Sequence, residues 1–338
     1  MKVLKVVAVA LLTVAAGIAL QQYFHASAVE RAVTLFENTA VQPVTEFGTT
    51  RRLEILPLMD VHSDDPALAT EVGLSYLITT DNNRILFDVG QNTAQENPSP
   101  LQRNITALGV DLATVDTVFI SHNHLDHVGG LHWQRLDTFS LGQEQTPFPN
   151  PMTQLVAPDA MSYPGMLSVF AGKPMPIGEG ISTSGLASTG PIGRQLAIGW
   201  IEEHALVVMV EGLGGVLIVG CGHQTLPFLL KRYHDAFEAP LYGVVGGVHF
   251  PVPEGRIHLG PIDVQRRLAS GGGLFSPLTM EEVEEQIGLL QQLDLGLLAV
   301  SGHDSSDEVI ERLAKAMPSA HQYVKVGKTI AMGAGAAD

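Results

Sequence analysis

Four side chains of metal-binding type fall within six consecutive positions of the sequence. They are His122, His124, Asp126 and His127, and the segment continues as Val128-Gly129-Gly130. Imidazole and carboxylate donors together suit zinc, iron or manganese. Because His122 and His124 alternate along an extended segment, both can point to one face, while Asp126 and His127 can reach a second point nearby. The motif therefore predicts a site for one or two divalent metal ions, with zinc preferred and iron or manganese as alternatives.

The residues before the motif indicate how it is positioned. Val115–Ile120 is mostly apolar and β-branched, which is typical of a β-strand, so the motif would begin where this strand ends at the edge of a sheet. Three further histidines also stand just past apolar runs, at His223, His249 and His303. Strands that end at one edge could bring all of these side chains together.

Strands and helices are predicted along the rest of the chain in bunches. The turn-forming residues Asp81-Asn82-Asn83 predict a hairpin between the two strands on either side of them. Bunched strands followed by helices favour two packed sheets covered by helices over a strictly alternating doubly wound sheet. The other expected strands are 53–59, 73–79, 84–89, 154–157, 205–210, 216–219, 241–245 and 296–300, and the expected helices are 100–108, 224–237, 280–293 and 306–316.

Composition limits the classes of protein and partner. With 338 residues, 45% of them hydrophobic and 16% charged, the chain is expected to fold as a globular protein. Its net charge is −16 and no dense Lys/Arg run is present, which argues against nucleic acid or an anionic membrane surface as the main partner. We expect a small-molecule substrate, which could itself be anionic because a bound metal reverses the local potential.

The first 28 residues look like a targeting segment. Lys2 and Lys5 precede an apolar run over 6–20, and a small-x-small sequence ends at Ala28, as in a secretory signal peptide. The expected location is periplasmic or secreted. If the segment is instead kept as an N-terminal anchor, the protein is attached to a membrane with its domain outside the cytoplasm. Cys221 is the only cysteine, so the chain cannot form an internal disulfide.

The predicted organisation follows from these features. A polar linker is expected at 29–52 and a metal-binding domain at 53–332, followed by a tail at 333–338. Two stretches rich in Pro, Gly and small polar residues, 134–195 and 251–277, are expected as long loops that serve as lids or binding loops, or simply as surface loops.

Several motifs together resemble a known superfamily. His122-Asn123-His124-Leu125-Asp126-His127 is similar to the HxHxDH signature of the metallo-β-lactamase superfamily, and Ile85–Gly90 resembles the strand and aspartate that precede it there. Gly73–Tyr76, Gly220–His223 and Gly246–His249 resemble, more narrowly, a subgroup called 7,8-dihydropterin-6-methyl-4-(β-D-ribofuranosyl)-aminobenzene-5′-phosphate synthase-like. The resemblance runs from about residue 53 to 332. It implies an α/β fold, a four-layer αββα sandwich with metals at one edge between the sheets.

The same resemblance raises two questions about the ligand set. The superfamily usually has a bridging aspartate where this chain has Cys221. Cys221 could bind metal as a thiolate, or it could be a small buried residue whose role His223 takes, which we prefer. His204 lies where many members of the superfamily, though not the subgroup, place another histidine ligand, so it is a further candidate.

Asp88 is expected beside the ligands rather than among them. A carboxylate at a strand end next to the motif can accept an imidazole N–H and fix the orientation of the ring. The alternative is an aspartate that only forms a turn before Gly90. Asp304, beside His303, could likewise orient that imidazole or cap the helix that follows.

These features predict an exported, metal-dependent hydrolase. An activated water would attack an ester, lactone, phosphoester or amide bond, and Asp126 would bind metal and orient the water or accept its proton. One alternative is a metal-containing binding or sensing protein with little turnover, which the missing bridging aspartate supports. Another is an iron-dependent redox enzyme of the same fold.

Overall fold

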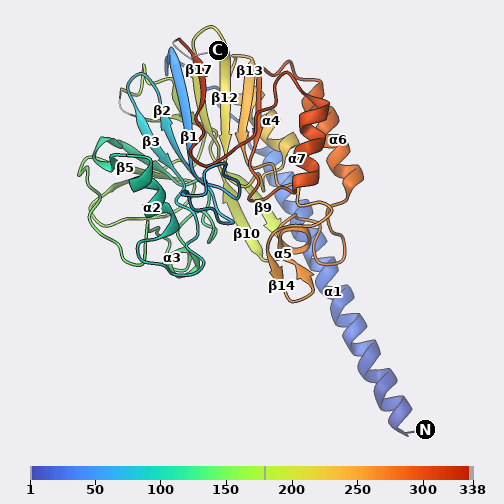
Figure 1. The fold of residues 1–338 in the computed structure, drawn as a ribbon. Helices are drawn as coiled ribbons and strands as arrows, with labels where there is room; N and C mark the ends of the chain where they lie inside the picture. The colour runs from blue at the N-terminus through green and yellow to red at the C-terminus, as the bar shows by residue number, and fades with distance from the viewer. Residues whose placement is uncertain (1, 179, 335–338) are drawn as a thin grey trace.

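Two large sheets form the centre of the molecule in the computed structural model, which describes residues 2–178 and 180–334 and, of these, omits the side chains of residues 2–10 and 14. The first sheet has seven strands and the second has six, and helices cover the outer faces (Figure 1). The predicted αββα sandwich is therefore confirmed.

The first sheet is mixed. β1 and β2 pair antiparallel, β2 and β3 form the predicted hairpin, and β3, β4, β5 and β6 run parallel. In sheet order its strands are β17 (Ile330–Gly333), β1 (Arg52–Met59), β2 (Ser75–Thr79), β3 (Arg84–Phe87), β4 (Thr117–Phe119), β5 (Gln154–Ala157) and β6 (Leu167–Phe170).

The second sheet is built in a similar way. β12, β13 and β16 are parallel, while β11 pairs antiparallel with β12 and with β8. In sheet order its strands are β16 (Leu297–Val300), β13 (Leu241–Gly246), β12 (Gly214–Val219), β11 (Leu206–Val210), β8 (Leu186–Ser188) and β7 (Met175–Pro176). Two small hairpins lie outside it, β9 (Ile192–Leu196) with β10 (Gly199–Glu203), and β14 (His258–Leu259) with β15 (Ile262–Asp263).

Alternating side chains divide the hydrophobic core into layers. Tyr76 and Phe87 face the second sheet and pack in one cluster with its Ile218. Leu77 and Leu86, one position along each strand, face outward and pack with residues of helix α2. The outer face of the second sheet packs against α4, α6 and α7. The helices are α1 (Lys2–Asn38), α2 (Pro100–Ala107), α3 (Leu131–Gln134), α4 (Leu226–Ala236), α5 (Val264–Leu268), α6 (Met280–Gln291) and α7 (Asp307–Ala316), with a short 3₁₀ turn η1 at Leu112–Thr114.

The carboxyl ends of six strands meet at one edge of the sandwich. β1 and β3 are both antiparallel to β2, so they run in the same direction, and β3 is parallel to β4. β12, β13 and β16 supply the matching ends of the second sheet. The predicted ligand motif follows β4 directly, so the sheet topology brings distant parts of the chain to one place.

The structure differs from the prediction in the two segments that were expected as long loops. The range 134–195, expected as a long loop, contains β6, β7 and β8 besides the predicted strand β5, and β9 begins there as well. The range 251–277 contains β14, β15 and α5. Several of these elements have only two or three residues, which is too short for a periodic pattern to appear in the sequence.

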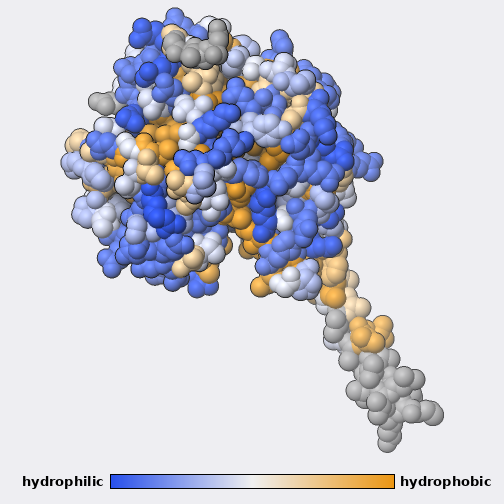
Figure 2. Space-filling model, viewed as in Figure 1, coloured by the Kyte–Doolittle hydropathy of each residue, from blue (hydrophilic) through white to orange (hydrophobic). Residues whose placement is uncertain are grey.

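Helix α1 continues beyond the predicted targeting segment, through the first part of the predicted linker. Its outer end projects from the body, and the described part of it is largely hydrophobic (Figures 1 and 2). Its inner end packs on α4, where the Phe36 and Phe228 rings stack with centroids 4.5 Å apart. Among the described residues, no helix combines the length and apolarity needed to cross a membrane. Residues 335–338 of the predicted tail lie outside the described residues.

Candidate metal centre

The strand ends bring eight of the predicted donor residues together. Three overlapping groups have donor atoms that all lie within 4.8 Å of one another, and most of these side chains are buried. The groups are His122, His124 and His223; Asp126, His127, Cys221 and His303; and Cys221, His223 and His249. Cys221 and His223 each belong to two groups, so the three form one continuous cluster.

The first group is a set of three imidazoles. His124 Nδ1 lies 3.1 Å from both His122 Nε2 and His223 Nε2. His223 Nδ1 donates to the Ala269 carbonyl at 3.1 Å, which leaves its Nε2 without a proton. His124 is only half-buried, so this is the side of the cluster that solvent can reach.

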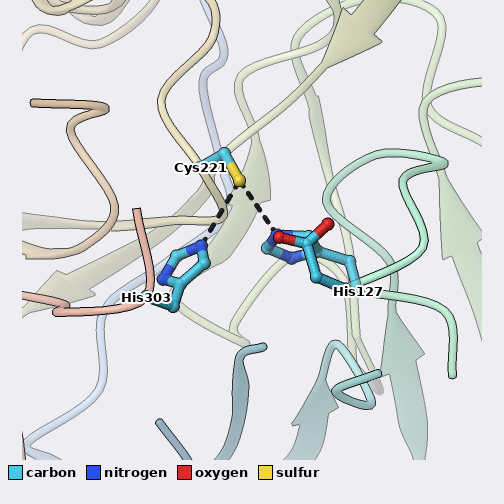
Figure 3. Close-up of side chains that lie close together, drawn as sticks. His127, Cys221 and His303 are labelled. Atoms are coloured by element: carbon cyan, nitrogen blue, oxygen red, sulfur yellow. Dashed lines mark hydrogen bonds and ion pairs between the residues drawn. The ribbon is translucent and has the colours of Figure 1, made fainter. Parts of the chain in front are cut away.

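The second group is centred on the thiol of Cys221. Its Sγ lies 3.0 Å from His127 Nε2 and 3.3 Å from His303 Nε2, between the two rings (Figure 3). Asp126 Oδ2 is 3.7 Å from the same His127 nitrogen. Cys221 thus lies among the donors, which is the first of the two arrangements considered from the sequence.

Asp88 fixes the tautomers of two histidines. Its Oδ2 accepts His127 Nδ1–H at 2.7 Å and the Ser121 hydroxyl at 2.7 Å. Because Ser121 donates to Asp88, its oxygen accepts His122 Nδ1–H at 2.9 Å. Both rings therefore carry a proton on Nδ1, and Nε2 of each faces the cluster.

A second carboxylate does the same for His303. The Ser301 hydroxyl donates to Asp60 Oδ2 at 2.5 Å and accepts His303 Nδ1–H at 2.6 Å. Asp60 follows β1 of the first sheet, whereas Ser301 follows β16 of the second. Neither residue was singled out from the sequence, because their contact joins positions 241 residues apart and no local pattern marks it.

Two more buried carboxylates hold the backbone of the ligand loops. Glu203, the last residue of β10, accepts the amide of Gly222 at 2.9 Å and that of His223 at 2.7 Å. Asp304 Oδ2 accepts the His249 amide at 2.8 Å. Asp304 therefore contacts the loop of His249 rather than acting as the N-cap of α7, which is Ser306. Glu203 was also missed by the sequence analysis.

The electrostatics of the cluster favour a bound cation. Burial lowers the pKa of His124 and of His249 to about 4, so both rings are neutral near pH 7. Burial, and then neighbouring imidazoles, lower the pKa of His122, His223 and His303 well below the ordinary value. Neutral imidazoles are the form that binds metal.

His127 is the exception, and its environment supports the same conclusion. Burial alone would lower its pKa, but Asp88 and Asp126 raise it to about 9. The position therefore stabilises a positive charge, which a metal ion would supply equally well. Burial raises the pKa of the Cys221 thiol, with further increases from Asp126 and Asp304, and a coordinated metal is the usual means by which such a thiol loses its proton.

A buried nitrogen without a partner also fits a metal. His249 Nε2 donates to the Gln265 carbonyl at 3.2 Å, so its Nδ1 carries a lone pair. That Nδ1 is buried and has no hydrogen-bond partner among the described residues. An orphaned buried acceptor is costly, and His249 stands in a donor group with Cys221 and His223. The residues present therefore fit one or two divalent metal ions.

His204 lies apart from the cluster. Its ring stacks on Phe119 at 4.1 Å between centroids, its Nε2 donates to the Ile120 carbonyl, and its Nδ1 accepts the Ser188 hydroxyl. Burial lowers its pKa to about 3. Both nitrogens are used between the two sheets, and the structure does not bring this ring to the donor groups.

A cleft of about 640 Å³ adjoins the ligand motif. Leu125, from the motif itself, forms part of its wall, and Trp133 supplies an aromatic surface. The remaining walls are mostly uncharged and polar. They include Gln91, Asn92, Thr93, Gln95 and Gln143.

Comparison with known proteins agrees with the resemblance predicted from the sequence. Residues 69–136 match the family model of the metallo-beta-lactamase superfamily. A segment of 63 residues, 18% of this chain, is 38% identical to 7,8-dihydropterin-6-methyl-4-(beta-D-ribofuranosyl)-aminobenzene-5'-phosphate synthase of Methanocaldococcus jannaschii. The match spans only 20% of that protein's length.

Solved structures share the fold over most of the chain. A metal-dependent hydrolase of the beta-lactamase superfamily aligns with a TM-score of 0.55 and 17% identity, covering 83% of this chain and 99% of that one. The metallo-beta-lactamase fold protein YhfI of Bacillus subtilis aligns with a TM-score of 0.50 and 12% identity, covering 83% and 100%. At these identities the likeness establishes the fold alone.

Proposed function

We propose that this chain, which has the metallo-β-lactamase fold and matches the family model of that superfamily over residues 69–136, is a member of the superfamily and a metal-dependent hydrolase. The observation that carries the proposal is the convergence of donor atoms from four loops at one sheet edge, with ring tautomers fixed by buried carboxylates. Such fixed orientation is typical of functional metal sites.

We assign the ligands from the three donor groups. His122, His124 and His223 would hold one ion, and Asp126, His127, Cys221 and His303 would hold a second, with His249 next to Cys221 and His223. Nitrogen, oxygen and sulfur donors in this combination favour zinc over magnesium or calcium. Divalent metal there would supply a water of lowered pKa and stabilise negative charge that develops on the substrate.

The chain's own residues have distinct roles in this proposal. Asp126 has the only carboxylate in the donor groups, and 9% of its side chain is exposed, so it can orient the attacking water or accept its proton. Asp88 and Asp60, acting through Ser121 and Ser301, hold the imidazole protons away from the cluster. The adjoining cleft would bind the rest of the substrate, whose scissile bond is an ester, lactone, phosphoester or amide.

A test of the enzyme proposal uses zinc-loaded protein and a panel of generic phosphodiester, lactone and carboxylic ester substrates. We expect turnover of at least one class, and we expect His122→Ala to abolish it. His234→Ala, a substitution of an exposed histidine that belongs neither to the donor groups nor to the cleft lining, is the matched control. Absence of turnover across the panel by protein shown to contain metal would contradict the enzyme proposal.

The position of Cys221 supports a second candidate, a metal-binding or sensing protein with little turnover. A thiol that contacts two ligand imidazoles is a strong metal donor in its own right. Metal analysis of the purified protein separates zinc, iron and manganese, and binding without hydrolysis would favour this candidate.

The assignment of Cys221 has a spectroscopic test. With cobalt(II) in place of zinc, a thiolate ligand should give an intense near-ultraviolet charge-transfer band, which Cys221→Ser should remove. We also expect Cys221→Ser to weaken binding of the second ion at least about tenfold, or about 1.4 kcal/mol. A spectrum that is unchanged by the substitution would exclude coordination by sulfur.

We further propose that the protein is exported and that its N-terminal segment is retained. The charged and apolar pattern of residues 1–20 supports export, and contacts of α1 with the body, including His25 Nε2 with the Gly271 carbonyl at 2.9 Å, support retention. Intact mass of the protein recovered from a membrane fraction tests this. A mature chain beginning at Val29 would show cleavage instead.

A further inference from the structure

A groove of about 710 Å³ separates helix α1 from the body. One wall is a stripe of α1 residues at helical spacing, from Gly17 through Leu20, Phe24 and Ala28 to Arg31. At about 1.5 Å per residue this stripe runs for about 21 Å. The other wall is formed by Gln195, Leu196, Ala197, Leu268, Gly273 and Leu274.

The groove is apolar along most of its length, and part of its lining is open to solvent. The side chains of Leu20 and Phe24 are 56% and 60% exposed although they lie on the face of α1 that lines the groove. Leu196, Leu268 and Leu274 lie on the other wall. An apolar surface of this kind is more stable when a ligand covers it.

The end of the groove near Arg31 is basic. Arg194, next to Gln195 of the wall, has its guanidinium over the Phe228 ring at 4.9 Å, and its Nε is buried without a hydrogen-bond partner. Arg31 donates to the Ser27 hydroxyl and to no other group among the described residues. Neither is among the cations that form ion pairs in the described part of the chain. In a chain with a net charge of −16, an arginine that lines the groove and a second arginine beside its wall, neither of them in an ion pair, favour an anion.

The basic end of the groove lies against the metal centre. His25 on α1 hydrogen-bonds to the Gly271 carbonyl, and Arg194 Nη2 approaches the same glycine. Two residues earlier, the Ala269 carbonyl accepts from His223, and the Ser270 hydroxyl lies 3.1 Å from His249 Nε2. One short segment therefore forms a wall of the groove and contacts two proposed ligands.

We propose that this groove binds a single-chain anionic amphiphile, such as a long-chain phosphate ester or fatty carboxylate. The apolar chain lies along α1 between Leu20 and Leu274, and the anionic head binds Arg31 and Arg194 beside the metal centre. Arginine suits this role because its planar guanidinium can bind phosphate or carboxylate bidentately. The site requires α1 to remain attached, and it does not depend on turnover at the metal centre.

Calorimetric titration of the full-length protein tests the proposal with three probes below their critical micelle concentrations. These are dodecyl phosphate, inorganic phosphate and uncharged dodecyl maltoside. We expect one dodecyl phosphate to bind per chain. Binding of the other two probes should be at least about tenfold weaker, because inorganic phosphate lacks the apolar chain and dodecyl maltoside lacks the anionic head. The same affinity after metal removal by chelation would show that the head group does not bind the metal ions.

Two variants examine the two parts of the groove. Ala197→Trp adds bulk at an exposed position on the wall, and Arg194→Gln removes the charge. Each should weaken binding at least about tenfold, or about 1.4 kcal/mol. Arg194→Lys should recover part of the loss, and Arg135→Gln, at an exposed arginine elsewhere, should have no effect. Binding unaffected by both groove variants, no saturable binding, or association with anionic vesicles only would overturn the proposal.

Discussion

The Ser301 hydroxyl hydrogen-bonds to a carboxylate at the end of one sheet and to a histidine at the end of the other. The hydroxyl has one proton, so it donates one of these hydrogen bonds and accepts the other. Because the serine hydroxyl donates its hydrogen bond to Asp60, the serine oxygen must accept from His303 Nδ1–H, and Nε2 of that ring is left free for metal. The proton is thus placed by a residue two hydrogen bonds from the metal centre. Asp88 and Ser121 repeat the arrangement at His122.

This relay predicts the effect of Asp60→Asn. The variant should bind its second metal ion about 10- to 100-fold more weakly, because the serine hydroxyl is no longer drawn to a carboxylate and can donate to His303. Competition with a chromophoric chelator measures the affinity. Asp64→Asn, which removes a largely exposed carboxylate paired with Lys325, is the matched control. Equal affinities for the two variants would show that Asp60 does not position His303.

Asp159 gives a prediction about pH. Burial, and then Asp137 and Glu202, raise its pKa from 3.8 to about 6, and its Oδ1 has no hydrogen-bond partner among the described residues. The ionised carboxylate is thus disfavoured in the folded state. Above about pH 6 it lowers the free energy of unfolding, and this destabilisation disappears as the pH falls toward the unfolded-state pKa of the side chain.

We therefore expect Asp159→Asn to raise the free energy of unfolding at about pH 7.5 by on the order of 1 kcal/mol. This value is smaller than the full shift implies, because part of the side chain is exposed to solvent. At about pH 4 the two proteins should have nearly the same stability. Urea unfolding at both pH values measures the difference, and a variant that is less stable at the higher pH would contradict the assignment.

At the scale of elements, a glycine at a strand end and a glycine within a helix differ in how closely other atoms approach them. A Cβ on Gly220, just after β12, would lie 2.2 Å from Ser121 Oγ and 3.1 Å from Glu203 Oε1. Among the described residues, nothing lies within 4 Å of the corresponding position on Gly288, in the second half of α6. The first glycine allows two loops of the metal centre to meet, and the second has no such role.

Opposite outcomes follow for the two alanine variants. Gly220→Ala should displace Ser121, lower stability by about 1–3 kcal/mol and weaken metal binding. Gly288→Ala should raise stability by about 0.4–1 kcal/mol through helix propensity and leave metal binding unchanged. Thermal unfolding and chelator competition on both variants test this. If Gly220→Ala matches the parent protein in both measurements, close packing of these loops is not required.

The elements that could be predicted from the sequence are those with a clear local pattern. Continuous apolar runs predicted β11, β12, β13 and β16, and an amphipathic run after Ser306 predicted α7. The short pairs β14 and β15 lack such a pattern. The HxHxDH motif could be found in the same way because its donors are neighbours, whereas Asp60, Ser301 and Glu203 gain their roles from contacts across the sandwich.

At the scale of the whole molecule, metal binding should be coupled to folding. A ligand that binds only the folded state at about 100 times its Kd adds about 2.7 kcal/mol. Removal of metal with a chelator should therefore lower Tm by about 4 °C. His122→Ala should show a smaller change under the same treatment. A Tm that does not respond to chelator or to added zinc would contradict coupling between the metal centre and stability.

The span of the donor groups gives the metal centre a further consequence. His124 and His223 are 99 residues apart, and His127 and Cys221 are 94 apart, so every proposed ion joins the two halves of the chain. A bound ion would thus act as a reversible cross-link that closes long loops, which lowers the entropy of the unfolded chain as a disulfide does. If the chain is exported, as we propose, the cation would take the place of the disulfides that exported proteins often use, and the strength of this cross-link would vary with the metal supply outside the cell.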